Sequence, residues 1–201
     1  MKKNINQANY FSLSYNYWTL IKSSIDEMEI QGNKTLIVSS HKPNETIEQS
    51  LVNYYQKTKW NDVNIGVPIL FNFYHGLELC MKGLLQEIEK LPTNKTHKLT
   101  DYFELILENA SLFIPEILTS IGKVMNANDP FYFFKNNNSN LDNYHQLLRY
   151  PESKKGNIFS YNEIRRKGKT GLENFKTIKI RCVEIENAII KWFKLISTKH
   201  E

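Results

Sequence analysis

The chain has little cysteine and no long apolar run, and both absences narrow what the protein can be. Its 201 residues contain two cysteines, Cys80 and Cys182, far apart and each inside helix-type sequence. They build neither a disulfide framework nor a zinc-ligand spacing, and two free thiols fit a reducing cytoplasm. Asn, His, Glu or Lys interrupts every apolar stretch well before the roughly 18 residues that a membrane span needs. We therefore expect a cytoplasmic protein with no membrane partner.

Other recognisable signals are missing too. The basic N-terminus leads into Asn, Gln, Ser and Tyr rather than an apolar run, so it does not resemble a secretory signal. Gly156, Gly168 and Gly171 stand in neither a Gly-Lys-Ser/Thr nor a Gly-x-Gly-x-x-Gly pattern, which argues against phosphate-loop and dinucleotide-binding folds. We expect no cofactor.

The composition is that of one ordinary globular domain, with 41% hydrophobic and 23% charged residues, so we expect residues 1–201 to form a single domain. The net charge of +5 is unevenly placed. Residues 1–143 carry 13 basic and 15 acidic side chains, whereas residues 144–201 carry 13 and 6, including all four arginines. A basic segment on a nearly neutral body suggests a polyanionic partner, with nucleic acid as the first candidate.

Apolar residues recur at helical spacing along most of the chain. The expected helices cover 8–30, 44–60, 68–91, 97–109, 116–127, 141–149 and 172–197. The helix over 68–91 is apolar nearly all round and should lie at the centre. Residues 136–140 and 152–170 read as loops, and 35–38 stay unassigned. No repeat or βαβ alternation appears, so the pattern predicts an all-α, up-and-down bundle with additional short helices and a basic loop before the C-terminal helix.

Three short motifs carry a family resemblance. They are the run from His75 to Leu85 with its Glu-x-x-x-Lys, the His97-x-Leu99 helix start, and Leu148-Arg149-Tyr150-Pro151-Glu152. Over roughly residues 68–151 the chain resembles the HEPN superfamily of helical, RNA-associated domains. Its size and composition are similar to those of abortive infection proteins of the AbiV type. The resemblance implies a HEPN-like bundle, a homodimer, and a role in bacterial phage defence.

The chain departs from the family's ribonuclease pattern, in which a histidine follows an arginine after four to six residues. None of the four arginines has a histidine at that spacing. The reverse order occurs instead, as His145-x-x-x-Arg149, and places both side chains one helical turn apart. Metal-independent RNA cleavage needs a proton acceptor, a proton donor and a cation facing the phosphate, and these two residue types supply them. A surface helix pair is the alternative interpretation.

Two further pairs are candidates for a cleft or an interface. Glu78 and Lys82 are four residues apart in an apolar helix, with His75 on the same stripe; they either form a structural ion pair or line a polar cleft. His97 and Asp101 have the same spacing, and the carboxylate can orient the ring at a helix start. Because no His-Glu-x-x-His pattern occurs, we expect no metal site.

The basic segment before the last helix is the clearest polyanion-binding feature. Its cations can neutralise phosphates, while Phe159 and Tyr161 can stack on bases. A solvated loop is the alternative. The expected RNA-binding residues are Lys154, Lys155, Arg165, Arg166, Lys167 and Lys169.

Two functions follow from these features. The first is a phage-defence protein that acts on RNA or translation, by RNA binding or metal-independent cleavage. The second is a non-catalytic protein that binds a phage-encoded protein or a toxin through its basic C-terminal region.

Overall fold

The computed structural model describes residues 9–34, 45–94, 96–126, 132–165 and 169–198. Within these ranges every regular element is a helix, and the only β-type pairing is an isolated bridge between Glu152 and Ile158. The expected all-α class is therefore confirmed. None of the described helices combines the length and apolarity that a bilayer crossing requires.

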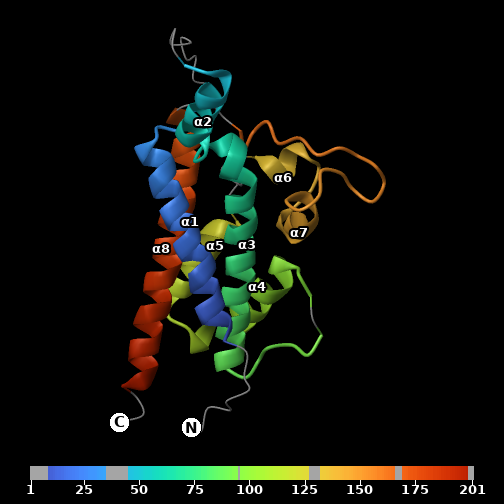
Figure 1. The fold of residues 1–201 in the computed structure, drawn as a ribbon. Coiled ribbons are helices and arrows are strands. Elements are labelled where there is room, and N and C mark those ends of the chain that lie inside the picture. The colour runs from blue at the N-terminus through green and yellow to red at the C-terminus, as the bar shows by residue number, and fades with distance from the viewer. Residues whose placement is uncertain (1–8, 35–44, 95, 127–131, 166–168, 199–201) are drawn as a thin grey trace.

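The bundle is built on three long helices, α1, α3 and α8, with shorter helices around them. The α-helices are α1 (Tyr10–Ile30), α2 (Ile47–Thr58), α3 (Asp62–Glu87), α4 (Leu99–Glu108), α5 (Pro115–Met125), α6 (Phe133–Asn136), α7 (Tyr144–Leu147) and α8 (Lys169–Ser197). The 3-10 turns are η1 (Ala110–Leu112) and η2 (Leu141–Asn143). Helices α1, α3 and α8 run side by side, while α6 and α7 lie on the far side of α3 (Figure 1).

Helix α3 is the central element, as its apolar sequence predicts. It packs against α1, α4, α7 and α8, and its buried residues point to every side. It begins earlier than expected, because the Asn61 side chain caps it by accepting a hydrogen bond from the Asn64 backbone N–H at 2.9 Å. Pro68 therefore lies inside the helix and not in its first turn, which corrects the predicted start.

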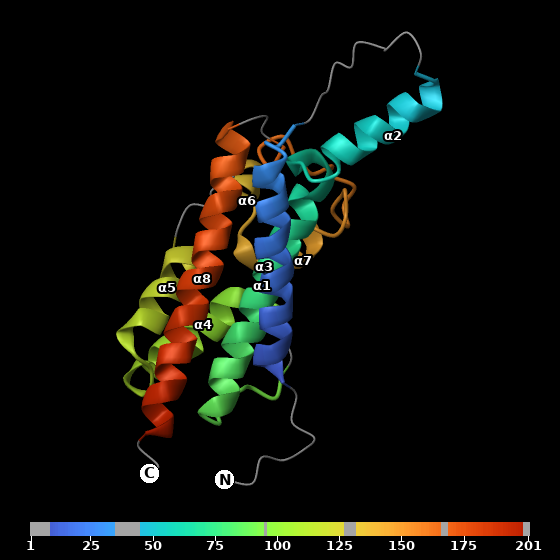
Figure 2. The ribbon, with the colours of Figure 1, turned by 60° about the vertical axis from the view of Figure 1, so that its left-hand side comes forward.

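Helix α2 lies apart from the bundle and projects away from it (Figure 2). Thr46 and Gln49 form a capping box at its start. Asn44, where the sequence predicts that this helix begins, lies outside the described residues. Ile47, Leu51 and Tyr55 lie at helical spacing on one side of α2, and all three are exposed.

Several predicted boundaries and inward positions need correction. Helix α8 begins at Lys169, and the helix expected over 141–149 is divided into η2 and α7. Helical spacing alone places Leu107 and Val183 on the inward faces of their helices, but they are 47% and 38% exposed. The unassigned residues 35–38 lie outside the described ranges.

Candidate functional site

Glu78 is the centre of a polar cluster on the otherwise apolar helix α3. Its side chain is 1% exposed and accepts a hydrogen bond from the Tyr144 hydroxyl. Lys82 Nζ lies 2.5 Å from Glu78 Oε1, so the ion pair that the four-residue spacing predicts is present. Burial alone would raise the pKa of Glu78, but the bonds from Lys82 and Tyr144 outweigh burial and hold that pKa below its ordinary value. A buried carboxylate therefore stays ionised at neutral pH.

The bonds to Glu78 act on their donors as well. Burial opposes the charged form of Lys82, yet its bond to Glu78 outweighs this effect and raises the pKa of Lys82. Burial and the neighbouring Glu78 charge raise the pKa of Tyr144 far above its ordinary value. Tyr144 is thus a neutral donor, and Lys82 a fixed cation, on either side of the carboxylate.

His97, in the segment that leads into α4, also faces Glu78. Its Nδ1 lies 3.2 and 3.4 Å from the two carboxylate oxygens, while 62% of the side chain is exposed. Because a carboxylate only accepts hydrogen bonds, Nδ1–H must donate, which leaves the lone pair of neutral His97 on Nε2. Glu78 therefore fixes both the orientation and the tautomer of an exposed imidazole.

His75 lies one turn before Glu78 on α3 and is half-buried among aromatic rings. It stacks on Phe71 with ring centroids 5.7 Å apart and meets Tyr17 edge-on at 5.0 Å. Its Nδ1 is 3.4 Å from the Tyr144 hydroxyl oxygen. Burial lowers the pKa of His75, although the Glu78 charge opposes the shift. The ring is therefore held neutral inside the cluster.

His145 approaches from α7, and its ring centroid lies 4.4 Å from that of His97. Arg149 Nη1 is 3.2 Å from His145 Nδ1, and since a guanidinium only donates, Nδ1 holds the lone pair and Nε2 the proton. Nε2 is buried without a hydrogen-bond partner among the described residues. Burial and the neighbouring His97 lower the pKa of His145.

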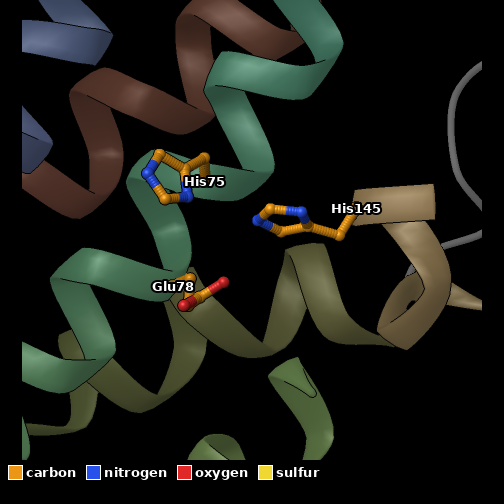
Figure 3. Close-up of side chains that lie close together, drawn as sticks. All are labelled: His75, Glu78 and His145. Atoms are coloured by element: carbon orange, nitrogen blue, oxygen red, sulfur yellow. The ribbon is translucent and has the colours of Figure 1, made fainter. Parts of the chain in front are cut away.

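The tip of the His145 ring points between His75 and Glu78 (Figure 3). One potential ligand atom from each of these three side chains lies within 4.8 Å of the other two. The structure thus brings one carboxylate and two imidazoles from α3 and α7 to a single point.

A hollow of about 540 Å³ opens beside His145 and Arg149. The segment Tyr150–Lys154 lines most of the remainder, and the Arg149 guanidinium lies 5.5 Å from the centre of the Tyr150 ring. Arg149 and Tyr150 are exposed, so a cation and an aromatic face are available to a ligand in this hollow.

Six of the seven predicted catalytic and cleft residues gather in this cluster. The members are His75, Glu78, Lys82, His97, His145 and Arg149. Asp101 is different: it accepts a hydrogen bond from Thr96 Oγ1 at 3.3 Å, while the His97 ring is oriented by Glu78. The expectation that Asp101 orients His97 was therefore wrong, because the loop before α4 turns the ring toward α3.

The basic segment lies only partly in the described ranges. Lys154 and Lys155 are exposed, and Lys154 lines the hollow next to Arg149. Arg165 is exposed as well, with its guanidinium 5.4 Å from the centre of the Tyr161 ring. Arg166 and Lys167 lie outside the described residues, and Lys169 is the first residue of α8.

Tyr144 is the functional residue that sequence reasoning missed. Its ring is completely buried, and its hydroxyl bridges Glu78 and His75. In the sequence it reads as one more core aromatic. The available signal was its position directly before His145, in a helical pattern that had to pack on α3.

No protein-family model matches this chain, and no curated protein or solved structure matches it either.

Proposed function

We propose that this chain is a HEPN-like bacterial phage-defence protein that binds RNA and cleaves it without a metal ion. One observation carries the proposal: the ring centroids of His97 and His145 lie 4.4 Å apart, and His145 lines a hollow of about 540 Å³ together with Arg149. A buried carboxylate orients one ring and an arginine contacts the other. Such a pair has the parts that acid–base cleavage of RNA requires.

The reaction that fits these groups is an internal transesterification. The ribose 2′-oxygen attacks the adjacent phosphorus, loses its proton to a base, and forms a 2′,3′-cyclic phosphate. The bond between phosphorus and the 5′-oxygen breaks, and an acid returns a proton to that leaving oxygen. A cation beside the phosphate stabilises the charge that develops on its oxygens.

Hydrogen bonding assigns the roles. His145 Nδ1 carries a lone pair on the side of Arg149, so it becomes the base when the guanidinium turns to the phosphate. His97 lies next to it, and its Nδ1–H faces Glu78. In its protonated form His97 also carries a proton on Nε2, and it gives this proton to the leaving oxygen as the acid. Arg149 supplies forked donors for the phosphate oxygens. Lys82 and Tyr144 hold Glu78 in place and act as positioning residues.

The basic segment supports RNA as the polyanion. Lys154 extends the positive surface along the hollow, and Arg165 is a further exposed cation, beside the Tyr161 ring. The roles in phage defence and as a homodimer come from the family resemblance, and both belong to the proposal.

The test is an RNA cleavage assay with the full chain. Purified protein is incubated with end-labelled single-stranded RNA and with a translating extract, alone and with candidate phage proteins. We expect cleavage that falls at least about 100-fold in Arg149→Ala and in His145→Ala, the size of effect that losing one charge-stabilising or acid–base group produces.

Arg181→Ala is the matched control, because Arg181 lies on α8, outside the cluster, and pairs with Glu184. Its cleavage rate should equal that of the wild type. Intact RNA under every condition, with translation or phage growth still reduced, would contradict the proposed ribonuclease activity.

The exposed face of α2 favours a second candidate function, a non-catalytic interaction protein. Ile47, Leu51 and Tyr55 form an apolar surface on a helix that projects from the bundle. A phage protein or toxin can dock there as well as on the basic C-terminal region. If Leu51→Ser with Tyr55→Ser abolishes phage protection while Arg149→Ala preserves it, this second function replaces the first.

A further inference from the structure

We infer that His75, Glu78 and His145 form a binding site for one divalent transition-metal ion of the zinc type. The site lies behind the proposed acid–base pair, on the buried side of His145 (Figure 3). Two imidazoles and a carboxylate are a donor set that suits zinc, copper or nickel better than magnesium.

The strongest observation is the state of His145 Nε2. This atom is buried and has no hydrogen-bond partner among the described residues, although its ring points at Glu78 and His75. A buried polar atom without a partner is costly, and a metal ion would satisfy it. Zinc–ligand bonds are about 2.0–2.2 Å, so donors that now lie within 4.8 Å of one another need to approach by roughly an ångström.

Nearby positive charges set the affinity. Lys82 already pairs with Glu78, and the Arg149 guanidinium lies beside His145. Both oppose a second cation, so this site should bind less tightly than a structural zinc centre. Arg149 is exposed and can swing away, and its removal should tighten metal binding.

Occupation of this site would inhibit the proposed cleavage, a step that rests on the proposed function. A metal ion on Nε2 needs the lone pair of that nitrogen, so the ring proton moves to Nδ1. Nδ1 then has no lone pair to accept the 2′-hydroxyl proton. Zinc would lock His145 in the tautomer that cannot act as the base.

The first test measures binding alone and does not need RNA. Zn²⁺ is titrated calorimetrically into the full chain, and Co²⁺ is used as a spectroscopic probe through its visible absorption. We expect one ion per chain, with affinity reduced at least about tenfold in His75→Ala and His145→Ala. Mg²⁺ should give no signal.

Controls separate this site from other histidines. His97→Ala should retain Zn²⁺ binding, and so should a variant with His41→Gln and His200→Gln. If His97→Ala abolishes binding, the ion lies on the exposed ring pair and the assigned ligand set is wrong. Absence of Zn²⁺ binding, or binding unchanged in His75→Ala and His145→Ala, would overturn the inference.

The second test links binding to activity. Zn²⁺ should inhibit RNA cleavage by the wild type, and His75→Ala should shift the inhibitory concentration upward at least about tenfold. Arg149→Ala should bind Zn²⁺ more tightly while losing cleavage, so the two properties move in opposite directions. If RNA is never cleaved but Zn²⁺ binds as described, the proposed function fails and the metal site stands.

Discussion

At the scale of single residues, one buried carboxylate organises the cluster because three different donors converge on it. Lys82, Tyr144 and His97 each bond to Glu78, and they come from three separate segments of the chain. Removing the carboxylate would leave a largely buried ammonium group without its partner, which is far more costly than losing a surface ion pair. The position of His97, and with it the proposed acid, therefore depends on Glu78.

A second buried carboxylate, Asp62, gives the protein a pH-dependent stability. Its Oδ2 accepts a hydrogen bond from Asn33 at 3.1 Å, whereas its Oδ1 has no partner among the described residues. Burial raises the pKa of Asp62, although the Asn33 and backbone hydrogen bonds oppose the shift. The folded protein then holds this proton more tightly than the unfolded chain. The contribution to stability is full below the ordinary pKa of an aspartate and is lost as pH rises through the raised pKa.

We expect Asp62→Asn to remove this dependence. The free energy of unfolding is measured by urea denaturation between pH 4 and 7. Its change with rising pH should be more positive in Asp62→Asn than in the wild type, because the loss that Asp62 causes is absent. The comparison of the two slopes isolates Asp62 from the other titrating groups. Equal slopes would show that Asp62 titrates in the folded protein as it does in the unfolded chain.

At the scale of elements, a glycine lets α1 and α3 approach closely. A Cβ atom at Gly76 would lie 2.5 Å from Nε1 of the buried Trp18. Gly122 in α5 is different, because the nearest atoms to its Cβ would lie at an ordinary 3.6 Å. The same substitution should therefore have opposite effects at the two positions.

Gly76→Ala should destabilise the fold by about 1–3 kcal/mol, because Trp18 or the helix itself must shift. Gly122→Ala should stabilise it by up to about 1 kcal/mol through the better helix propensity of alanine. Both are measured by urea denaturation. Equal effects of the two substitutions would refute the close α1–α3 contact.

Some features of these helices can be predicted from the sequence and others cannot, and the reasons are physical. The central position of α3 follows from its apolar residues, and the start of α5 follows from Pro115. The start of α3 was placed too late because Pro68 is a typical first-turn residue, while the actual cap, Asn61, has no distinctive neighbours. The break before α7 depends on how Leu141–Asn143 packs, which periodicity does not encode.

The contacts in the cluster are also only partly predictable from the sequence. The spacing of Glu78 and Lys82 predicts their ion pair, and His145-x-x-x-Arg149 predicts its contact. The four-residue spacing also suggests that Asp101 orients His97. In the structure Glu78, which lies 19 residues before His97 in the chain, orients the ring instead. Tertiary packing brings α3, α7 and the segment before α4 together, and no local pattern contains that information.

At the scale of the whole molecule, the basic C-terminal part of the chain begins at the cluster. The excess of basic residues begins at position 144, the first residue of α7, and Arg149 and Lys154 carry it along the hollow. Part of this positive charge therefore lies next to the groups proposed to act on RNA. The segment Arg165–Lys169 extends the same polarity along the chain toward α8.

Alanine at Arg165, Arg166, Lys167 and Lys169 together should weaken RNA binding and reduce its salt dependence. Each lost phosphate contact removes about 0.7 from the slope of log K against log salt, so four contacts remove roughly 3. Titrations of labelled single-stranded RNA at several salt concentrations measure the slope. The matched control replaces four exposed lysines elsewhere with alanine: Lys57, Lys59, Lys90 and Lys135. An unchanged slope in the first variant would remove the segment from the RNA interface.

The chemistry of the RNA ends tests the central claim most directly. Cleavage products formed by the wild-type chain in the presence of EDTA are analysed for their termini. The proposed acid–base mechanism predicts 2′,3′-cyclic phosphates and 5′-hydroxyls, with no product from His97→Ala or His145→Ala above the buffer background. Products with 3′-hydroxyl and 5′-phosphate ends, or cleavage that EDTA abolishes, would contradict it.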